Sequence, residues 1–272
     1  MCIRDSALSL RKMERAWTAV AESSEKSGPP LAPFENRARG FAAYAIGNAQ
    51  YQKYLRLAPS TDVLDEALQC MIEAQRFIDD FAVAIGTEAL IYEKMFDRMR
   101  ASLDSESVPN HYERLLKLIA LAIDKTTRAI GETVEPRILT VSYNNLGNEQ
   151  LKLGKIVLLT QGDSRATKHF SDAKEAIESA ERYDPNNSVA WFTHAEIEAM
   201  LLVCRNIEQP TTKDFKVVSG LLAKSHASLK KHDQETKKIL DSRDDLLSCF
   251  PELTKKYPKW YEALPEHFGE KK

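Results

Sequence analysis

Apolar residues recur every three or four positions along most of this chain, the spacing that places them on one face of an α-helix. Glycine and proline separate these runs, and the chain holds only ten glycines in 272 residues and no Asn-Gly hairpin turn. The pattern therefore predicts an all-α protein. We expect helices over 7–26, 35–57, 61–80, 81–103, 111–130, two within 137–184, then 191–206, 212–232 and 233–248.

The stretch around residue 147 predicts two antiparallel helices that pack closely. Gly147 in the first helix and Ala173 in the second are small, so the two backbones can approach each other where the helices cross. Pro185 ends the second helix because proline cannot continue one. Asn187 or Ser188 can cap the helix that follows.

This pair of helices resembles a tetratricopeptide (TPR) repeat. The resemblance is carried by Tyr143-x2-Leu146-Gly147, then Ala173-x3-Ile177, Ala180 and Pro185, with Trp191, His194 and Ala195 beginning a further repeat. Two features depart from the family pattern. Gln150 stands where the family prefers tyrosine, and 18 residues separate Gly154 from Ala173 where the family has only a few.

Weaker copies of the same series recur along the chain. Residues 46–48 repeat the phase of residues 146–148, and Ala67-x3-Met71 repeats Ala173-x3-Ile177. The resemblance implies a TPR-like α-solenoid of about four helical hairpins with flanking helices. The small residues at 47, 89, 147 and 195 are 42, 58 and 48 positions apart. That spacing exceeds the family period of about 34, so we expect degenerate repeats with long helices.

We divide the chain into three regions: an N-terminal helix and linker over 1–34, a TPR-like domain over 35–232, and a C-terminal capping helix and tail over 233–272. Residues 1–6, Met-Cys-Ile-Arg-Asp-Ser, resemble a translated sequencing adapter, and we interpret them as adapter-derived. Solenoids need a capping helix with a polar outer face. We expect the tail, with Trp260 and Tyr261 among lysines, to pack on the last hairpin.

Charge and composition narrow the possible partners. Lysine and arginine total 38 against 40 acidic residues, a net charge of -2 that gives no signal for nucleic acid or an anionic membrane. No apolar run approaches the roughly 18–20 residues that span a bilayer. Cys70, Cys204 and Cys249 are widely spaced in apolar helical runs, which favours buried thiols over disulfides. We expect a cytoplasmic protein.

The sequence lacks the common catalytic motifs: a phosphate loop, Gly-x-Gly-x-x-Gly, a Gly-x-Ser-x-Gly elbow and His-Glu-x-x-His. His194 and Glu198 are four positions apart and could share a helix face as a metal pair. A metal site needs further ligands, however, and His194 stands at a core position of the repeat pattern. We therefore expect no enzymatic activity, no cofactor and no metal site.

The family resemblance implies protein–protein interaction, with a concave groove lined by the first helix of each hairpin. The implied lining residues lie three positions before the small residue and one and four positions after it. They are Tyr44, Asn48 and Tyr51 in the first hairpin, Asn144, Asn148 and Leu151 in the third, and Phe192, Glu196 and Ala199 in the fourth. We expect an adaptor or assembly scaffold that binds a peptide or partner protein. The alternatives are an RNA-associated helical repeat, or tyrosines that serve the core with asparagines that merely face solvent.

Overall fold

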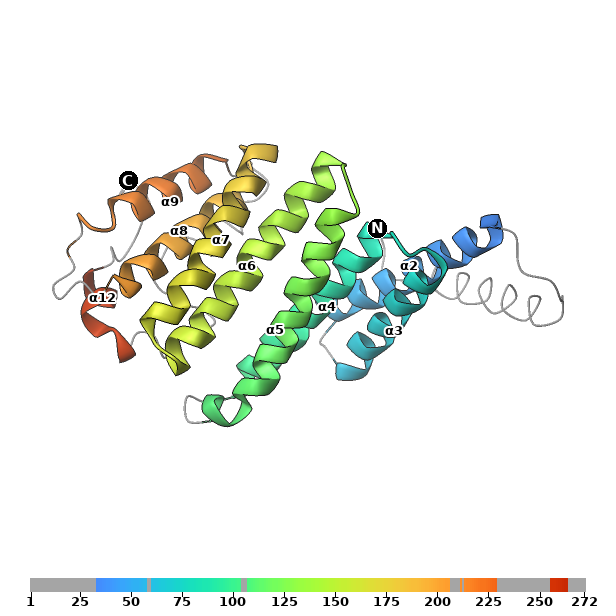
Figure 1. The fold of residues 1–272 in the computed structure, drawn as a ribbon, viewed down its shortest axis with the longest axis horizontal. Coiled ribbons are helices and arrows are strands. Elements are labelled where there is room, and N and C mark those ends of the chain that lie inside the picture. Colours follow the sequence, from blue (N-terminus) through green and yellow to red (C-terminus); the bar gives the residue numbers. More distant parts are fainter. Residues whose placement is uncertain are drawn as a thin grey trace. The chain divides into compact units, whose positions relative to one another are not determined.

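The computed structural model describes residues 33–57, 60–103, 107–205, 211, 213–228 and 255–263, and every regular element among them is an α-helix (Figure 1). The helices are α2 (Pro33–Arg56), α3 (Thr61–Phe77), α4 (Ala82–Ala101), α5 (Val108–Gly131), α6 (Pro136–Thr160), α7 (Asp163–Tyr183), α8 (Ser188–Cys204), α9 (Lys216–Ser228) and α12 (Pro258–Ala263). The prediction of an all-helical chain is confirmed for these residues. No described helix is both long enough and apolar enough to cross a membrane.

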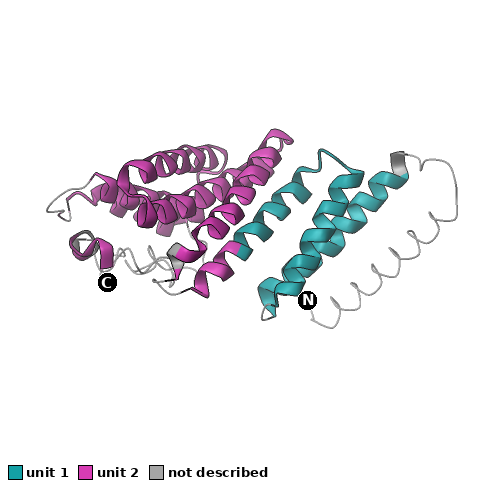
Figure 2. Cartoon of the chain, turned by 60° about the horizontal axis from the view of Figure 1, so that its bottom comes forward, with its two compact units in different colours: residues 1–95 teal, residues 96–272 magenta. Residues whose placement is uncertain are grey.

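The chain divides into two compact units, residues 1–95 and 96–272 (Figure 2). The boundary falls inside α4, so the predicted second hairpin, 81–136, is shared between the two units. The proposed limits of the repeat domain stay a prediction. The predicted helices over 7–26 and 233–248 and the adapter-like residues 1–6 lie outside the described residues.

In the first unit, α2 and α3 form a helical hairpin, and the two helices cross at a glycine of α2. A Cβ placed on Gly47 would lie 2.6 Å from the Cβ of Cys70 and 3.1 Å from the carbonyl oxygen of Ala67. Met71, fully buried, reaches the same point with its terminal methyl. Any side chain at position 47 would therefore push the two helices apart.

In the second unit, each helix from α5 to α9 packs against the next one, and α6 also contacts α8. The α6–α7 hairpin crosses as the first hairpin does. A Cβ on Gly147 would lie 2.4 Å from Cγ1 of Ile177 and 3.2 Å from the carbonyl oxygen of Ala173. The predicted close approach at Gly147 is confirmed, and the pairs Ala67–Met71 and Ala173–Ile177 occupy matching places against their glycines.

The turns between these helices follow local sequence signals. Asn187 is the N-cap of α8, and its side-chain oxygen accepts a hydrogen bond from the backbone N–H of Ala190 at 3.2 Å, as predicted. Gly162 has φ of 95°, a conformation that favours glycine, and forms the turn between α6 and α7. The turn is short, because α7 already begins at Asp163.

The part of the tail that the structure describes, 255–263, contacts the end of α6 and the beginning of α7, and packing of the whole tail on the last hairpin stays a prediction. Lys256 donates to the carbonyl oxygen of Leu158 at 2.6 Å, and the hydroxyl of Tyr257 donates to Asp163 at 2.6 Å. The last carbonyl groups of a helix have no partner within it, so the end of α6 attracts a cation that the tail supplies.

Candidate functional site

One side of α6 and one side of α8 carry matching series of residues. On α6, four further positions lie three, seven, eleven and fourteen residues after the first residue of the series. These intervals are close to whole helical turns, so all five positions share one stripe of the helix. Ala195 on α8 corresponds to Gly147 on α6, so each corresponding position on α8 is 48 residues later in the sequence. We call this surface the α6–α8 face; it consists of Val141, Asn144, Asn148, Lys152 and Lys155 on α6 and Val189, Phe192 and Glu196 on α8.

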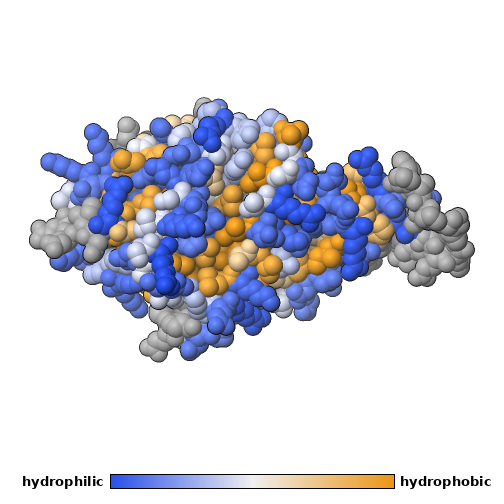
Figure 3. Space-filling view, in the orientation of Figure 1, coloured by the Kyte–Doolittle hydropathy of each residue, from blue (hydrophilic) through white to orange (hydrophobic). Residues whose placement is uncertain are grey.

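The face begins with exposed apolar side chains. Val141 is 53% exposed and Val189 is 47% exposed, although valine usually lies in a core. Phe192, Asn144 and Asn148 follow them and are partly buried. Figure 3 shows apolar surface open to solvent between hydrophilic side chains on the visible side of the molecule. This end of the face therefore offers apolar area beside amide groups.

The other end of the face holds two lysine–carboxylate pairs. Lys152 donates to Asp97 on α4 at 2.6 Å, and Lys155 pairs with Glu196 on α8. The Lys155 side chain is only 4% exposed, so its charge has little access to water and depends on Glu196. These pairs connect α6 to its neighbours on both sides and neutralise the lysine charges.

A third polar contact ties α6 to α5. Thr126, buried on α5, donates a hydrogen bond from its hydroxyl to a carboxylate oxygen of Glu149 at 2.8 Å. Glu149, Lys152 and Lys155 follow one another at intervals of three residues, so they lie along one side of α6. Polar residues with bonded partners thus occupy positions of α6 that would otherwise be apolar core.

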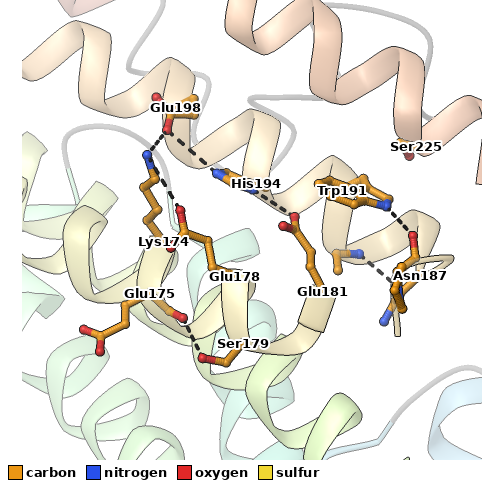
Figure 4. A network of polar contacts seen from close by, with 12 residues as sticks. Lys174, Glu175, Glu178, Ser179, Glu181, Asn187, Trp191, His194, Glu198 and Ser225 are labelled. Carbon is orange, nitrogen blue, oxygen red and sulfur yellow. Dashed lines mark hydrogen bonds and ion pairs between the residues drawn. The ribbon is translucent and has the colours of Figure 1, made fainter. Parts of the chain in front are cut away.

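A separate charged network joins α7 to α8 (Figure 4). His194 lies between two carboxylates: Nδ1 is 2.8 Å from Glu181, and Nε2 is 3.8 Å from Glu198. Lys174 donates to the same Glu198 oxygen at 2.6 Å. Glu181 and Lys174 come from α7, whereas His194 and Glu198 come from α8, so the network fastens the two helices together.

The network holds His194 and Glu198 in their charged forms. Burial by itself lowers the pKa of His194, but hydrogen bonds and charges from Glu181 and Glu198 outweigh it and raise the pKa to about 9. The neighbouring His194 is the main reason that the pKa of Glu198 falls to about 2, against the opposing effect of burial, and Lys174 adds to the decrease. At neutral pH the ring is therefore an imidazolium between two carboxylates.

This state limits what His194 can do chemically. Both ring nitrogens of an imidazolium carry protons, so neither has a lone pair to bind a metal or to accept a proton. Within the described residues, no group of three or more His, Cys, Asp or Glu side chains is placed to hold a metal ion. The structure gives His194 a role in packing α7 against α8.

The nine residues predicted to line a groove divide into two groups. Tyr51, Leu151 and Ala199 are 5%, 1% and 0% exposed, so they are core residues that a partner at the surface does not reach. The remaining six are partly buried: Tyr44, Asn48, Asn144, Asn148, Phe192 and Glu196.

Among these six, two have well-defined neighbours. Tyr44 packs against the ring of Phe81 with centroids 5.2 Å apart, and burial raises the pKa of its hydroxyl. Glu196 is paired with Lys155 and is not available to a partner as an isolated charge. Asn144 and Asn148 lie on the same stripe of α6, and the side-chain oxygen of Asn144 is buried without a hydrogen bond from the described residues.

Sequence reasoning missed the exposed apolar position and the two lysines. The apolar residue lies six positions before the small residue in every first helix: Phe41, Val83, Val141 and Val189. That recurrence could have been found from the sequence. Lys152 and Lys155 interrupt the apolar run 151–159, which also could have marked them as paired charges.

A scan of protein-family models finds no match to this chain, and a search of curated proteins finds no relative.

Proposed function

We propose that this chain is a protein-interaction scaffold built from TPR-like helical hairpins, and that it binds a partner protein on the α6–α8 face. The proposal combines the resemblance around Gly147 with the matching crossings at Gly47 and Gly147. An arrangement of hairpins as a solenoid, with the first helices on its inner side, is part of this proposal. A cytoplasmic location stays a prediction.

The observation that carries the proposal is the repeated apolar position. Phe41 is 54% exposed, Val141 53% and Val189 47%, and each lies six residues before the small residue of its helix. Folding alone favours burying such side chains, since an exposed valine contributes nothing to the core. Val141 and Val189 belong to the same unit, and their recurrence at one place in two first helices supports a surface that contacts a partner.

The chemistry of the face suits an extended, uncharged segment of a protein. Asn144 and Asn148 can donate to and accept from a peptide backbone whatever its side chains are. Val141 and Val189 would contact apolar side chains of the partner, and the paired lysines leave no isolated cation for a carboxylate.

The alternative of RNA binding needs a continuous basic stripe on one face. Lys152 and Lys155 are the basic residues of the α6–α8 face, and each is paired with a carboxylate. Nothing on this face favours RNA over protein.

Capture of a partner from the native source tests the proposal. The full chain with Val141→Ser and Val189→Ser should lose most of the partner that the parent chain retains, as identified by mass spectrometry. Both side chains are about half exposed, so the substitutions should change stability by less than about 0.5 kcal/mol each.

A matched control uses Val217→Ser on α9, which is 58% exposed and lies outside the face. This variant should retain the partner as the parent does. The proposal is wrong if Val217→Ser reduces capture as much as the double variant does, or if the double variant captures the partner fully.

A further inference from the structure

The short segment 255–263 contacts the end of α6 and the beginning of α7 through two neighbouring side chains. The Lys256 ammonium donates to the carbonyl oxygen of Leu158, and the Tyr257 hydroxyl donates to Asp163, both at 2.6 Å. The Lys256 Nζ also lies 5.4 Å from the centre of the Tyr257 ring. A lysine and a tyrosine next to each other in sequence therefore reach the end of α6 and the beginning of α7 together.

The end of α6 is prepared for a cation. The backbone N–H of Gly162 bonds to the carbonyl oxygen of Val157 at 3.1 Å, because the chain turns at Gly162 with positive φ. The Leu158 carbonyl consequently loses the partner that the next turn of helix would have provided. An ammonium group supplies a charge-assisted hydrogen bond where the helix dipole is negative.

The beginning of α7 is prepared for a hydroxyl donor. Asp163 is the first residue of α7, and its carboxylate accepts the Tyr257 hydrogen bond. Burial is the largest cause that raises the pKa of Tyr257, and Asp163 adds to it, so the phenol keeps its proton and donates. Asp163 thus distinguishes tyrosine from phenylalanine by one hydrogen bond.

We propose that the ends of α6 and α7 form a docking site for a Lys-Tyr pair, and that residues 255–263 are its internal ligand. We call this segment the strap. The strap begins 27 positions after the end of α9 at Ser228. It is therefore not a continuation of α6 or α7, the helices that it contacts. The site binds a lysine ammonium through a backbone carbonyl and a tyrosine hydroxyl through a carboxylate. The lysine and the tyrosine are adjacent in the chain.

Rebinding of the strap as a separate peptide tests this site. The probe is a fluorescent synthetic peptide of residues 251–265, measured by fluorescence anisotropy against full chains. The chain with Lys256→Ala and Tyr257→Phe should bind it at least about tenfold more tightly than the parent, whose site is already filled by its own strap at high effective concentration.

Two controls separate docking from non-specific attachment. A peptide with phenylalanine in place of Tyr257 should bind the double variant about tenfold more weakly, since one charge-assisted hydrogen bond is lost. Adding Asp163→Asn to the double variant should weaken binding of the original peptide. Equal binding to the parent and the double variant, or binding to neither, would overturn the proposal.

A second measurement does not depend on the double variant being folded. In the chain with Tyr257→Phe alone, trypsin should cleave after Lys256 about tenfold faster than in the parent, because the strap leaves its site more often. Equal cleavage rates would show that the strap is not held by this hydrogen bond, and the site would be rejected.

Discussion

The α2–α3 and α6–α7 hairpins share a framework and differ in the chemistry placed on it. Both cross at a glycine, Gly47 or Gly147, where an added Cβ would lie 3.1 or 3.2 Å from an alanine carbonyl oxygen. Five and eight residues after the glycine, α2 carries Gln52 and Leu55, whereas α6 carries Lys152 and Lys155. Leu55 is 48% exposed, but Lys155 is 3% exposed and paired.

The residues that determine how closely the two helices cross are therefore different from those that determine the chemistry along the first helix. Small residues at the crossing determine how closely two helices approach, and the sequence repeats them. Residues further along the first helix are free to vary, so one hairpin exposes a leucine where another buries a charge. A hairpin can thus keep its packing while the chemistry of its first helix changes.

Removing the partner of Lys155 should give the largest effect. Glu196→Gln leaves a buried ammonium without its carboxylate and should lower the free energy of unfolding by about 3–5 kcal/mol in chemical denaturation. The corresponding place in the first hairpin provides the control: Leu55→Ala should cost less than about 1 kcal/mol, because the side chain is already half exposed. Similar losses in both variants would contradict the distinction between the hairpins.

The His194 network should make the packing of α7 against α8 sensitive to high pH. A pKa of about 9 in the folded chain against 6.5 in the unfolded chain means that the stabilisation is complete below pH 6.5 and is lost as pH rises through about 9. At about 1.4 kcal/mol for each pKa unit, the loss has an upper limit of about 3 kcal/mol.

Thermal unfolding between pH 6.5 and pH 9 measures this loss, with His194→Gln as the control. The variant lacks the titrating group, so its melting temperature should vary less with pH over that range. Glu198 acts in the opposite range: its stabilisation is present above pH 4.5 and is lost as pH falls toward about 2. A parent chain and a variant with identical profiles would refute the network's contribution.

Replacing the crossing glycine with alanine should destabilise each hairpin by a similar amount. Gly147→Ala and Gly47→Ala should each cost about 1–3 kcal/mol by overpacking, despite the better helix propensity of alanine. Gly220→Ala on α9 is the matched control, because nothing lies within 4 Å of its Cβ position. That variant should gain up to about 1 kcal/mol. If Gly147→Ala is as stable as the parent, the close crossing is not where we place it.

Much of the fold could be predicted from the sequence because its determinants are local or periodic. Gly147, Ala173 and Ile177 reveal the crossing by their spacing, and Asn187 reveals the start of α8 by its capping chemistry. The partner of Lys155 could not be predicted, since Glu196 is 41 positions away and the pairing depends on how α6 meets α8. The position of the strap depends likewise on a carbonyl left open by the turn at Gly162.

The candidate site was predicted less completely than the fold. Tyr51, Leu151 and Ala199 are core residues, whereas Asn144, Asn148, Phe192 and Glu196 are partly buried and their contact with a partner stays a prediction. A family pattern gives positions relative to the small residue, and a long, degenerate helix does not expose all of those positions equally.

Photo-crosslinking tests the central claim, that the α6–α8 face binds a partner protein, most directly. A photoreactive phenylalanine analogue is placed at position 141, 189 or 217 of the full chain, and crosslinked proteins are identified by mass spectrometry. The account predicts that the same partner is crosslinked from positions 141 and 189 and not from 217. Crosslinking from position 217 alone, or equally from all three, would contradict it.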